Sequence, residues 1–112
     1  MTARTRRALR ALLAVHPGFA MVGEAVDGEE AVTAVERLRP DLVLLDVRMP
    51  RLDGIAATAR ITARWPAVRV VAHSLAVERR DDALAAGADA FVPKGAPTDE
   101  LLSALRAGDG TR

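Results

Sequence analysis

The stretch DLVLLD, residues 41–46, places four consecutive apolar residues between two acids. A strand with one solvated face alternates apolar and polar side chains, whereas an unbroken apolar run is typical of a strand buried on both faces, as in a parallel sheet. The stretch therefore predicts a buried strand over 42–45 and, through it, an α/β fold.

Segments of helical period alternate with short apolar runs on both sides of this strand. Further strands are predicted at 20–26, 68–73 and 90–92. Helices are predicted behind a capping box of Asp27 and Glu30, at 53–65, at 77–86 and from Thr98 onward. Such alternation implies right-handed crossovers and a parallel sheet with helices on both faces. We expect one three-layer α/β/α domain over residues 1–112.

The alternation opens on a helix. Residues 4–15 carry Leu9, Leu12 and Leu13 on one side and stop at Pro17-Gly18, which predicts a helix over this segment. The sequence predicts no strand in front of this helix. A first strand is therefore missing from the expected sheet.

The composition excludes several classes of protein. The 112 residues include 16 basic and 15 acidic side chains, and a net charge of +1 makes no general case for a nucleic-acid-binding protein. Zero cysteines exclude a disulfide framework and a thiolate metal site. No apolar run is long enough for a membrane span, and we expect a cytoplasmic protein.

Basic residues crowd the start of the chain, at Arg4, Arg6, Arg7 and Arg10. A solvated helix face is the simplest interpretation of this cluster. An arm that binds a polyanion is the alternative, and no other part of the sequence supports it.

Asp46, Ser74 and Lys94 each follow a predicted strand. Ligands of open parallel sheets bind beyond the carboxyl ends of the strands, so a carboxylate, a hydroxyl and an ammonium are expected at one edge. A carboxylate can attack phosphorus, while the other two groups can hold phosphoryl oxygens. Singly, these residues would be interpreted as a turn residue, a helix N-cap and a solvated lysine. Together they predict phosphoryl chemistry.

The sequence around Asp46 resembles the phosphoacceptor loop of bacterial response-regulator receiver domains. The resemblance rests on LLDVRMPRLDG at 44–54 and on AGADAFVPK at 86–94, which is similar to the last strand of that family with its active-site lysine. Shorter matches between residues 23 and 41 resemble the subgroup that usually continues into a helix-turn-helix domain. The resemblance covers essentially the whole chain and implies a flavodoxin-like, CheY-like fold with the strand order 2-1-3-4-5.

The resemblance also implies roles for single residues. Asp46 is implied as the phosphoacceptor, Lys94 as the partner of the phosphoryl oxygens, and Ser74 as the switch hydroxyl that closes on the phosphoryl group. Phe91 matches the switch aromatic that turns inward when Ser74 moves, and an ordinary core residue is an equal alternative. The implied Mg²⁺ ligands are Asp46 and the backbone carbonyl of Arg48.

The sequence departs from the family at its start and at His73. Family members begin with a strand that ends in two adjacent acids, which hold Mg²⁺, whereas no acid precedes Glu24 here. Mg²⁺ is thus implied by the resemblance, while the absent acidic pair argues against its binding. A start assigned too late, a truncated receiver and a pseudo-receiver would each explain this departure. His73 takes a place that is usually apolar, and we interpret it as structural and not as a phosphate relay.

We interpret the chain as a receiver domain of a two-component phosphorelay and not as an enzyme. A histidine kinase is the implied phosphoryl donor to Asp46. The surface around the last strand and helix is implied as the contact for a second copy or another regulator, and no nucleic-acid-binding domain is expected in this chain. The alternative is a phosphorylation-independent interaction module that lacks the Mg²⁺-binding acids.

Overall fold

The computed structural model describes residues 11–15, 20–48 and 53–106, with side chains described from Gly23 onward. The strands are β1 (Ala11–Val15), β2 (Ala20–Ala25), β3 (Leu42–Leu45), β4 (Arg69–Ser74) and β5 (Ala90–Pro93). They form one sheet in the order β2-β1-β3-β4-β5. This is the order that the family resemblance implies.

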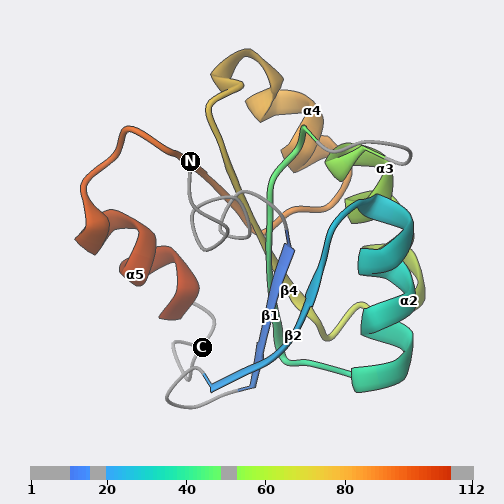
Figure 1. Cartoon of the computed structure of the whole chain (residues 1–112). Coiled ribbons are helices and arrows are strands. Elements are labelled where there is room, and N and C mark those ends of the chain that lie inside the picture. Colours follow the sequence, from blue (N-terminus) through green and yellow to red (C-terminus); the bar gives the residue numbers. More distant parts are fainter. Residues whose placement is uncertain (1–10, 16–19, 49–52, 107–112) are drawn as a thin grey trace.

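The helices are α2 (Gly28–Leu38), α3 (Gly54–Arg64), α4 (Arg80–Ala85) and α5 (Thr98–Arg106), with a 3-10 turn η1 (Val77–Arg79) in front of α4. Figure 1 shows α2 and α3 on one side of the sheet and α5 on the other. The predicted three-layer architecture is therefore confirmed. Within the described ranges, none of these helices is long and apolar enough to cross a membrane.

The strands of the sheet do not all run the same way. β3, β4 and β5 are parallel, as the apolar run at 42–45 predicts. β1 runs antiparallel to both of its neighbours, β2 and β3. Since β2 consequently has the direction of β3, β1 is the one reversed strand among the five described.

The helix predicted over residues 4–15 is wrong at residues 11–15, which form β1; residues 4–10 lie outside the described part of the chain. A short apolar run fits a helix face or a buried strand equally well, and the position between β2 and β3 offers hydrogen-bonding edges on both sides. The connection between β1 and β2, residues 16–19, is short enough to join only antiparallel strands. The centre of the sheet, where the sequence predicts no strand, is thus filled by a reversed one.

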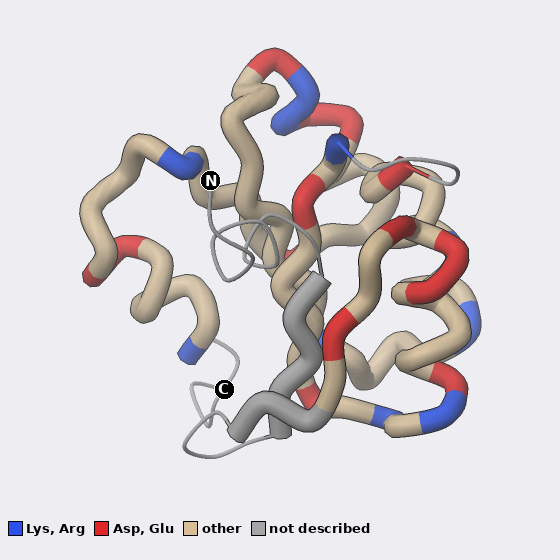
Figure 2. The backbone as a smooth tube through the Cα atoms, viewed as in Figure 1, with Lys and Arg blue, Asp and Glu red and all other residues tan. Residues whose placement is uncertain are grey.

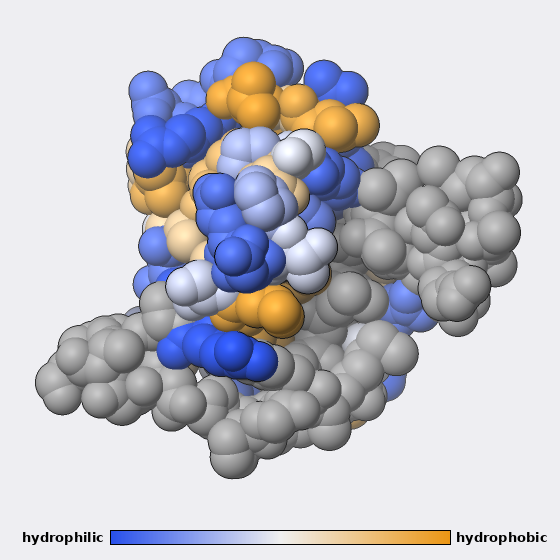
Figure 3. Space-filling model, turned by 90° about the vertical axis from the view of Figure 1, so that its left-hand side faces the viewer, coloured by the Kyte–Doolittle hydropathy of each residue, from blue (hydrophilic) through white to orange (hydrophobic). Residues whose placement is uncertain are grey.

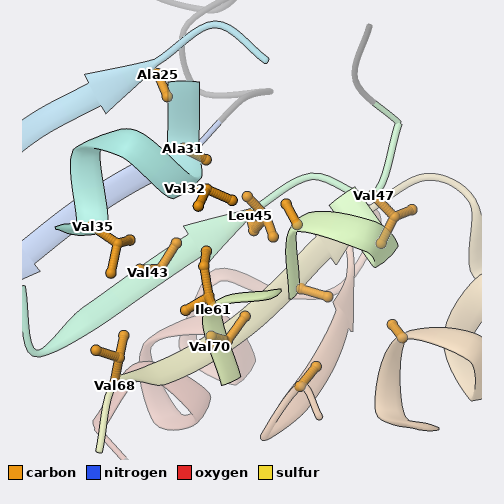
Figure 4. Packing of buried hydrophobic residues seen from close by; sticks show 14 of the residues in the cluster. Ala25, Ala31, Val32, Val35, Val43, Leu45, Val47, Ile61, Val68 and Val70 are labelled. Carbon is orange, nitrogen blue, oxygen red and sulfur yellow. The ribbon is translucent and has the colours of Figure 1, made fainter. Parts of the chain in front are cut away.

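The larger hydrophobic core lies between the sheet and helices α2, α3 and α4. Figure 4 shows Val43, Leu45 and Val70 of the sheet packed with Val35 of α2 and Ile61 of α3. All five side chains are fully buried. Burial of a side chain of this size stabilises a fold by about 2 kcal/mol, so this face fixes the positions of β3 and β4.

A smaller cluster covers the opposite face of the sheet. Leu42, Val71 and Val92 are buried there, against apolar residues of α5. The Arg69 guanidinium also donates two hydrogen bonds, of 3.1 and 2.9 Å, to the backbone oxygen of Ala104 in α5. Alternate residues of β3, β4 and β5 thus belong to alternate faces, as the pleat requires.

The predicted starts of α2 and α3 are confirmed by their hydrogen bonds. Asp27 Oδ1 accepts from the Glu30 backbone N–H at 2.9 Å, and Glu30 Oε1 accepts from the Val26 N–H at 2.9 Å. This reciprocal pair is the predicted capping box. Asp53 caps α3 in the same way, by accepting from the Ala56 N–H at 2.9 Å.

α3 begins unusually close to the end of β3. The Gly54 N–H donates to the Val47 backbone oxygen at 2.9 Å. A Cβ atom at position 54 would lie 2.1 Å from the Asp46 backbone oxygen and 2.4 Å from the Val47 Cα atom. No side chain fits in that space, so Gly54 is what allows α3 to start against the residue that ends the central strand.

Candidate functional site

The carboxyl ends of β3, β4 and β5 bring together the three residues predicted from the strand ends. Lys94 Nζ lies 2.6 Å from Asp46 Oδ2, and the two side chains are 11% and 9% exposed. A hydrogen bond between charged groups is strong at this length, and the low exposure of both side chains limits its screening by solvent. The carboxylate and the ammonium are therefore held directly against each other at this edge of the sheet.

The second carboxylate oxygen of Asp46 is held by the backbone. Oδ1 accepts a hydrogen bond of 2.9 Å from the Arg48 N–H. One oxygen of the carboxylate thus faces an ammonium and the other an amide, and the backbone of Gly54 lies close to the carbonyl of the same residue. A carboxylate fixed in this way is oriented before any reaction, which lowers the entropic cost of an attack on a bound electrophile.

Ser74 is fully buried at the end of β4. Its Oγ accepts a hydrogen bond of 3.0 Å from the Ala76 N–H, and its carbonyl accepts one of 3.1 Å from the Lys94 N–H. Ser74 therefore lies beside Lys94 in the sheet, with its hydroxyl bound to the loop that leads to η1. Phe91 pairs with Ala72 on β4 and packs, partly buried, against the larger core cluster.

Two ion pairs link the loops at the mouth of this site. Arg48 Nη2 lies 3.6 Å from Glu78 Oε2, and Arg79 Nη2 lies 3.6 Å from Asp53 Oδ2. They join the ends of the β3–α3 connection to η1, where Figure 2 shows acidic and basic residues in close succession. The Arg48–Glu78 pair is well exposed, so it contributes well under about 1 kcal/mol to stability. These pairs set the charge pattern of the mouth and contribute little to its rigidity.

His73 lies half-buried on β4, one residue before Ser74. Burial lowers the pKa of its imidazole below the usual 6.5, and the positive charge of Lys94 lowers the pKa further; the Asp46 carboxylate opposes these effects and raises it. The ring is accordingly neutral near pH 7. His73 therefore lies within the electrostatic influence of both Asp46 and Lys94 at this edge of the sheet.

The described residues do not form a Mg²⁺ site by themselves. Mg²⁺ requires close to octahedral oxygen coordination, and one oxygen of Asp46 already faces an ammonium. No group of three His, Asp or Glu side chains within the described residues is arranged to hold a metal ion. Among the described residues, the expected donors at this edge are the carbonyl of Arg48 and the carboxylate of Asp46.

Several features of the site have no local signal in the sequence. The Arg48–Glu78 pair joins residues 30 positions apart, and neither flanking segment marks it. The close approach of Gly54 to Asp46 is visible only in three dimensions. By contrast, the placement of Asp46, Ser74 and Lys94 at one edge follows from strand ends alone.

The three-layer fold and the polar residues at the carboxyl edge of its sheet are those of the CheY-like class of signalling domains. A family model described as "Response regulator receiver domain" matches residues 2–106, and the chain belongs to that family. It is thus the receiver domain of a two-component response regulator. Receiver domains interact with histidine kinases and phosphotransfer partners, generally bind Mg²⁺, and are not enzymes in their own right.

The chain is similar to parts of longer curated proteins. It is 42% identical over 92 residues to a protein-glutamate methylesterase/protein-glutamine glutaminase of Alkalilimnicola ehrlichii, an alignment that covers 80% of this chain and 24% of that protein. It is 34% identical over 107 residues to the transcriptional regulatory protein DegU of Brevibacillus brevis, with 90% and 44% covered. The chain therefore spans less than half the length of either relative.

Solved structures share the fold. A chain of the CheX-CheY-BeF3-Mg²⁺ complex from Borrelia burgdorferi matches with a TM-score of 0.74 and 30% identity, over 81% of this chain and 71% of that chain. A LuxR-family two-component response regulator from an Aurantimonas species matches with a TM-score of 0.75 and 33% identity, over 82% and 67%. None of the comparisons supports the phosphorylation-independent alternative.

Proposed function

We propose that residues 1–112 form a single receiver domain in which Asp46 accepts a phosphoryl group from a histidine kinase. The observation that carries the proposal is the contact of 2.6 Å between Lys94 Nζ and Asp46 Oδ2, with both side chains about nine-tenths buried. A carboxylate is a nucleophile toward phosphorus, and an adjacent ammonium can stabilise the negative charge of the phosphoryl oxygens. Family membership supports the same role.

In the proposed reaction an Asp46 oxygen forms a bond to phosphorus while the bond from phosphorus to the donor nitrogen or oxygen breaks. Negative charge is then concentrated on the phosphoryl oxygens. The Lys94 ammonium is already in place to stabilise that charge, in surroundings where electrostatic interactions are stronger than in water. The hydroxyl of Ser74 would donate to a phosphoryl oxygen, which shifts Oγ relative to the Ala76 N–H that it now holds.

The proposed output is a change on the surface near β5 and α5. Movement at Ser74 reaches the loop at 75–79 directly, and Phe91 on the neighbouring strand is the proposed switch aromatic. Leu75 and Val77 of this loop are exposed apolar residues, 68% and 54% accessible. Figure 3, which faces the α5 side, shows apolar surface at the same end of the molecule as α4. Exposed apolar side chains next to charges are typical of a contact surface for a second copy or another regulator.

The proposal is tested by incubating the purified chain with Mg²⁺ and acetyl phosphate and measuring its intact mass. We expect a gain of one phosphoryl group, which is lost in Asp46→Asn. Asp81→Asn is the matched control, because the Asp81 side chain is 93% exposed on α4 and should leave the gain unchanged. A folded wild-type chain that takes up no phosphoryl group, or an Asp46→Asn variant that still does, would overturn the proposal.

A further inference from the structure

A hollow of about 390 Å³ lies at the amino-terminal edge of the sheet, away from Asp46. Its lining comes from residues 39–41, which lead from α2 into β3, and from residues 64–68, which lead from α3 toward β4. Figure 1 shows α2 and α3 side by side, so their last turns bring these two segments together. Small-molecule sites typically have volumes of about 300–1,000 Å³. The hollow is therefore large enough for a small ligand, and it is distinct from the phosphoacceptor site.

Two arginine side chains lie over the same indole ring in this hollow. The guanidinium carbon of Arg64 is 4.5 Å from the centroid of the Trp65 ring, and that of Arg39 is 5.7 Å from it. Both distances are within the limit of about 6 Å for a cation–π contact. A guanidinium that uses its face in this way keeps its N–H groups in its own plane, where they can donate two parallel hydrogen bonds to a carboxylate.

The backbone conformation of Arg39 is unusual for a residue with a side chain. Arg39 ends α2 in the left-handed region, at φ 47° and ψ 57°, which glycine usually adopts at this position. Its Nε donates a hydrogen bond of 2.9 Å to the carbonyl of Glu36 in the last turn of α2. The guanidinium is thus held between that carbonyl and the Trp65 ring before any ligand binds, which lowers the entropic cost of binding.

The lining as a whole is mostly apolar and carries more positive than negative charge. Asp41 is the single acid among the described lining residues, against the two arginines. Arg64 also lies 3.6 Å from Glu36, but both side chains are more than half exposed, and an ion pair so exposed is weak enough for a ligand to displace it. An anion joined to an apolar group complements this surface. Besides the indole, the apolar part of the lining consists of Pro40, Pro66, Ala67 and Val68.

We propose that this hollow binds a small organic carboxylate whose body is compact and apolar. Arg39 and Arg64 bind the carboxylate, while the indole of Trp65 and the neighbouring prolines contact the apolar body. A purely structural role for the arginines, as a cover of the indole, would give no saturable binding of such a ligand. A cation of the same shape would be repelled by both guanidiniums. The proposal does not depend on phosphorylation of Asp46.

The test uses the fluorescence of Trp65, which is the only tryptophan in the sequence and therefore reports on this hollow. The purified chain is titrated with sodium benzoate. We expect a saturable change of fluorescence with a dissociation constant on the order of 1 mM, a usual strength for a ligand of this size. Benzyl alcohol and benzylamine carry a similar ring without the negative charge, and each should bind at least about tenfold more weakly.

Arg64→Gln removes one of the two guanidiniums and should weaken benzoate binding at least about tenfold. Arg60→Gln is the matched control. Arg60 lies one turn earlier on α3, is as exposed as Arg64, and likewise pairs with a glutamate of α2, Glu29 at 3.8 Å, but it does not line the hollow. This control variant should bind benzoate as wild type does.

Three results would overturn the proposal. They are a fluorescence that shows no saturable change, an Arg64→Gln variant that binds benzoate as tightly as wild type, and benzylamine that binds at least as tightly as benzoate. Since Arg64 is more than half exposed, Arg64→Gln should fold, and circular dichroism checks this. Arg39→Lys is a second variant, because lysine keeps the charge but lacks the planar guanidinium; it should also weaken binding, and an unchanged affinity would contradict the role of Arg39.

Discussion

The two halves of the sheet are built on different principles. In the half formed by β3, β4 and β5, parallel strands are joined through helices, and each strand ends in a polar residue or is directly followed by one at the same edge. In the half formed by β1 and β2, a short connection makes a hairpin, and its inner strand runs against the rest. The site therefore depends on the relative direction of neighbouring strands. Only strands that run together deliver their carboxyl ends to one place.

The strongest way to break the parallel half is to remove its buried counterion. Lys94→Met would leave the nearly buried Asp46 carboxylate facing an apolar side chain, which costs about 3 kcal/mol of unfolding free energy. Urea denaturation measures this loss. Adding Asp46→Asn should restore a large part of it, because the unpaired charge is then gone. Two losses that simply add would show that the pair is not coupled.

A second break acts on the backbone and involves no charge. Gly54→Ala would place a Cβ atom 2.1 Å from the Asp46 backbone oxygen, so β3 and α3 must move apart, at a cost of about 3 kcal/mol. Thermal unfolding provides the measurement. Gly95→Ala is the control, because no atom lies within 4 Å of a Cβ there, and it should stay within about 0.5 kcal/mol of wild type.

The direction of β1 can be tested by a cross-link. Ala11 pairs with Ala25 in the antiparallel register, and the chain has no cysteine of its own. The double variant Ala11→Cys/Ala25→Cys should therefore oxidise to a disulfide and gain up to about 3 kcal/mol of stability. Val15→Cys/Ala25→Cys, which only a parallel β1 would bring together, should remain reduced. The reverse result, read from the mass after alkylation, would show a parallel strand.

The smallest expected effect concerns the charge of His73. Its pKa, followed by NMR, should lie below 6.5, rise in Lys94→Met and fall in Asp46→Asn. As the pH falls, the imidazole of the unfolded chain is protonated at a higher pH than the imidazole of the folded chain. The contribution of His73 to the free energy of unfolding is therefore at its full value above pH 6.5 and is lost as the pH falls toward the folded pKa. If neither substitution changes the pKa of His73, the ring does not lie close to Asp46 and Lys94.

The sequence allowed the parallel half to be predicted almost completely. The apolar run at 42–45, the caps at Asp27 and Asp53, and the polar residues after three strands each depend on neighbours within a few positions. β1 could not be predicted in this way. Five consecutive apolar residues are compatible with a helix or with a strand. Residues 11–15 form a strand because they pair with β2 and β3, and that pairing cannot be predicted from the local sequence.

The same limit applies within the site. The strand ends predict that Asp46, Ser74 and Lys94 meet, because strand register carries them there. They do not predict which atoms touch. The Lys94–Asp46 contact depends on side-chain reach across β4, and the Arg48–Glu78 pair depends on how two distant loops fold over the edge.

The hydrogen bond from the Ala76 N–H to Ser74 Oγ has a consequence for partners of this domain. In the proposed function, the Ser74 hydroxyl interacts either with the Ala76 N–H of the loop or with the phosphoryl group on Asp46. The conformation of the loop and the phosphorylation of Asp46 are therefore thermodynamically linked. A protein that binds the loop more tightly once Oγ has moved must, by the same factor, make the phosphorylated form more favourable. Binding of a partner to this loop would then be measurable as a change in the fraction of the domain that is phosphorylated.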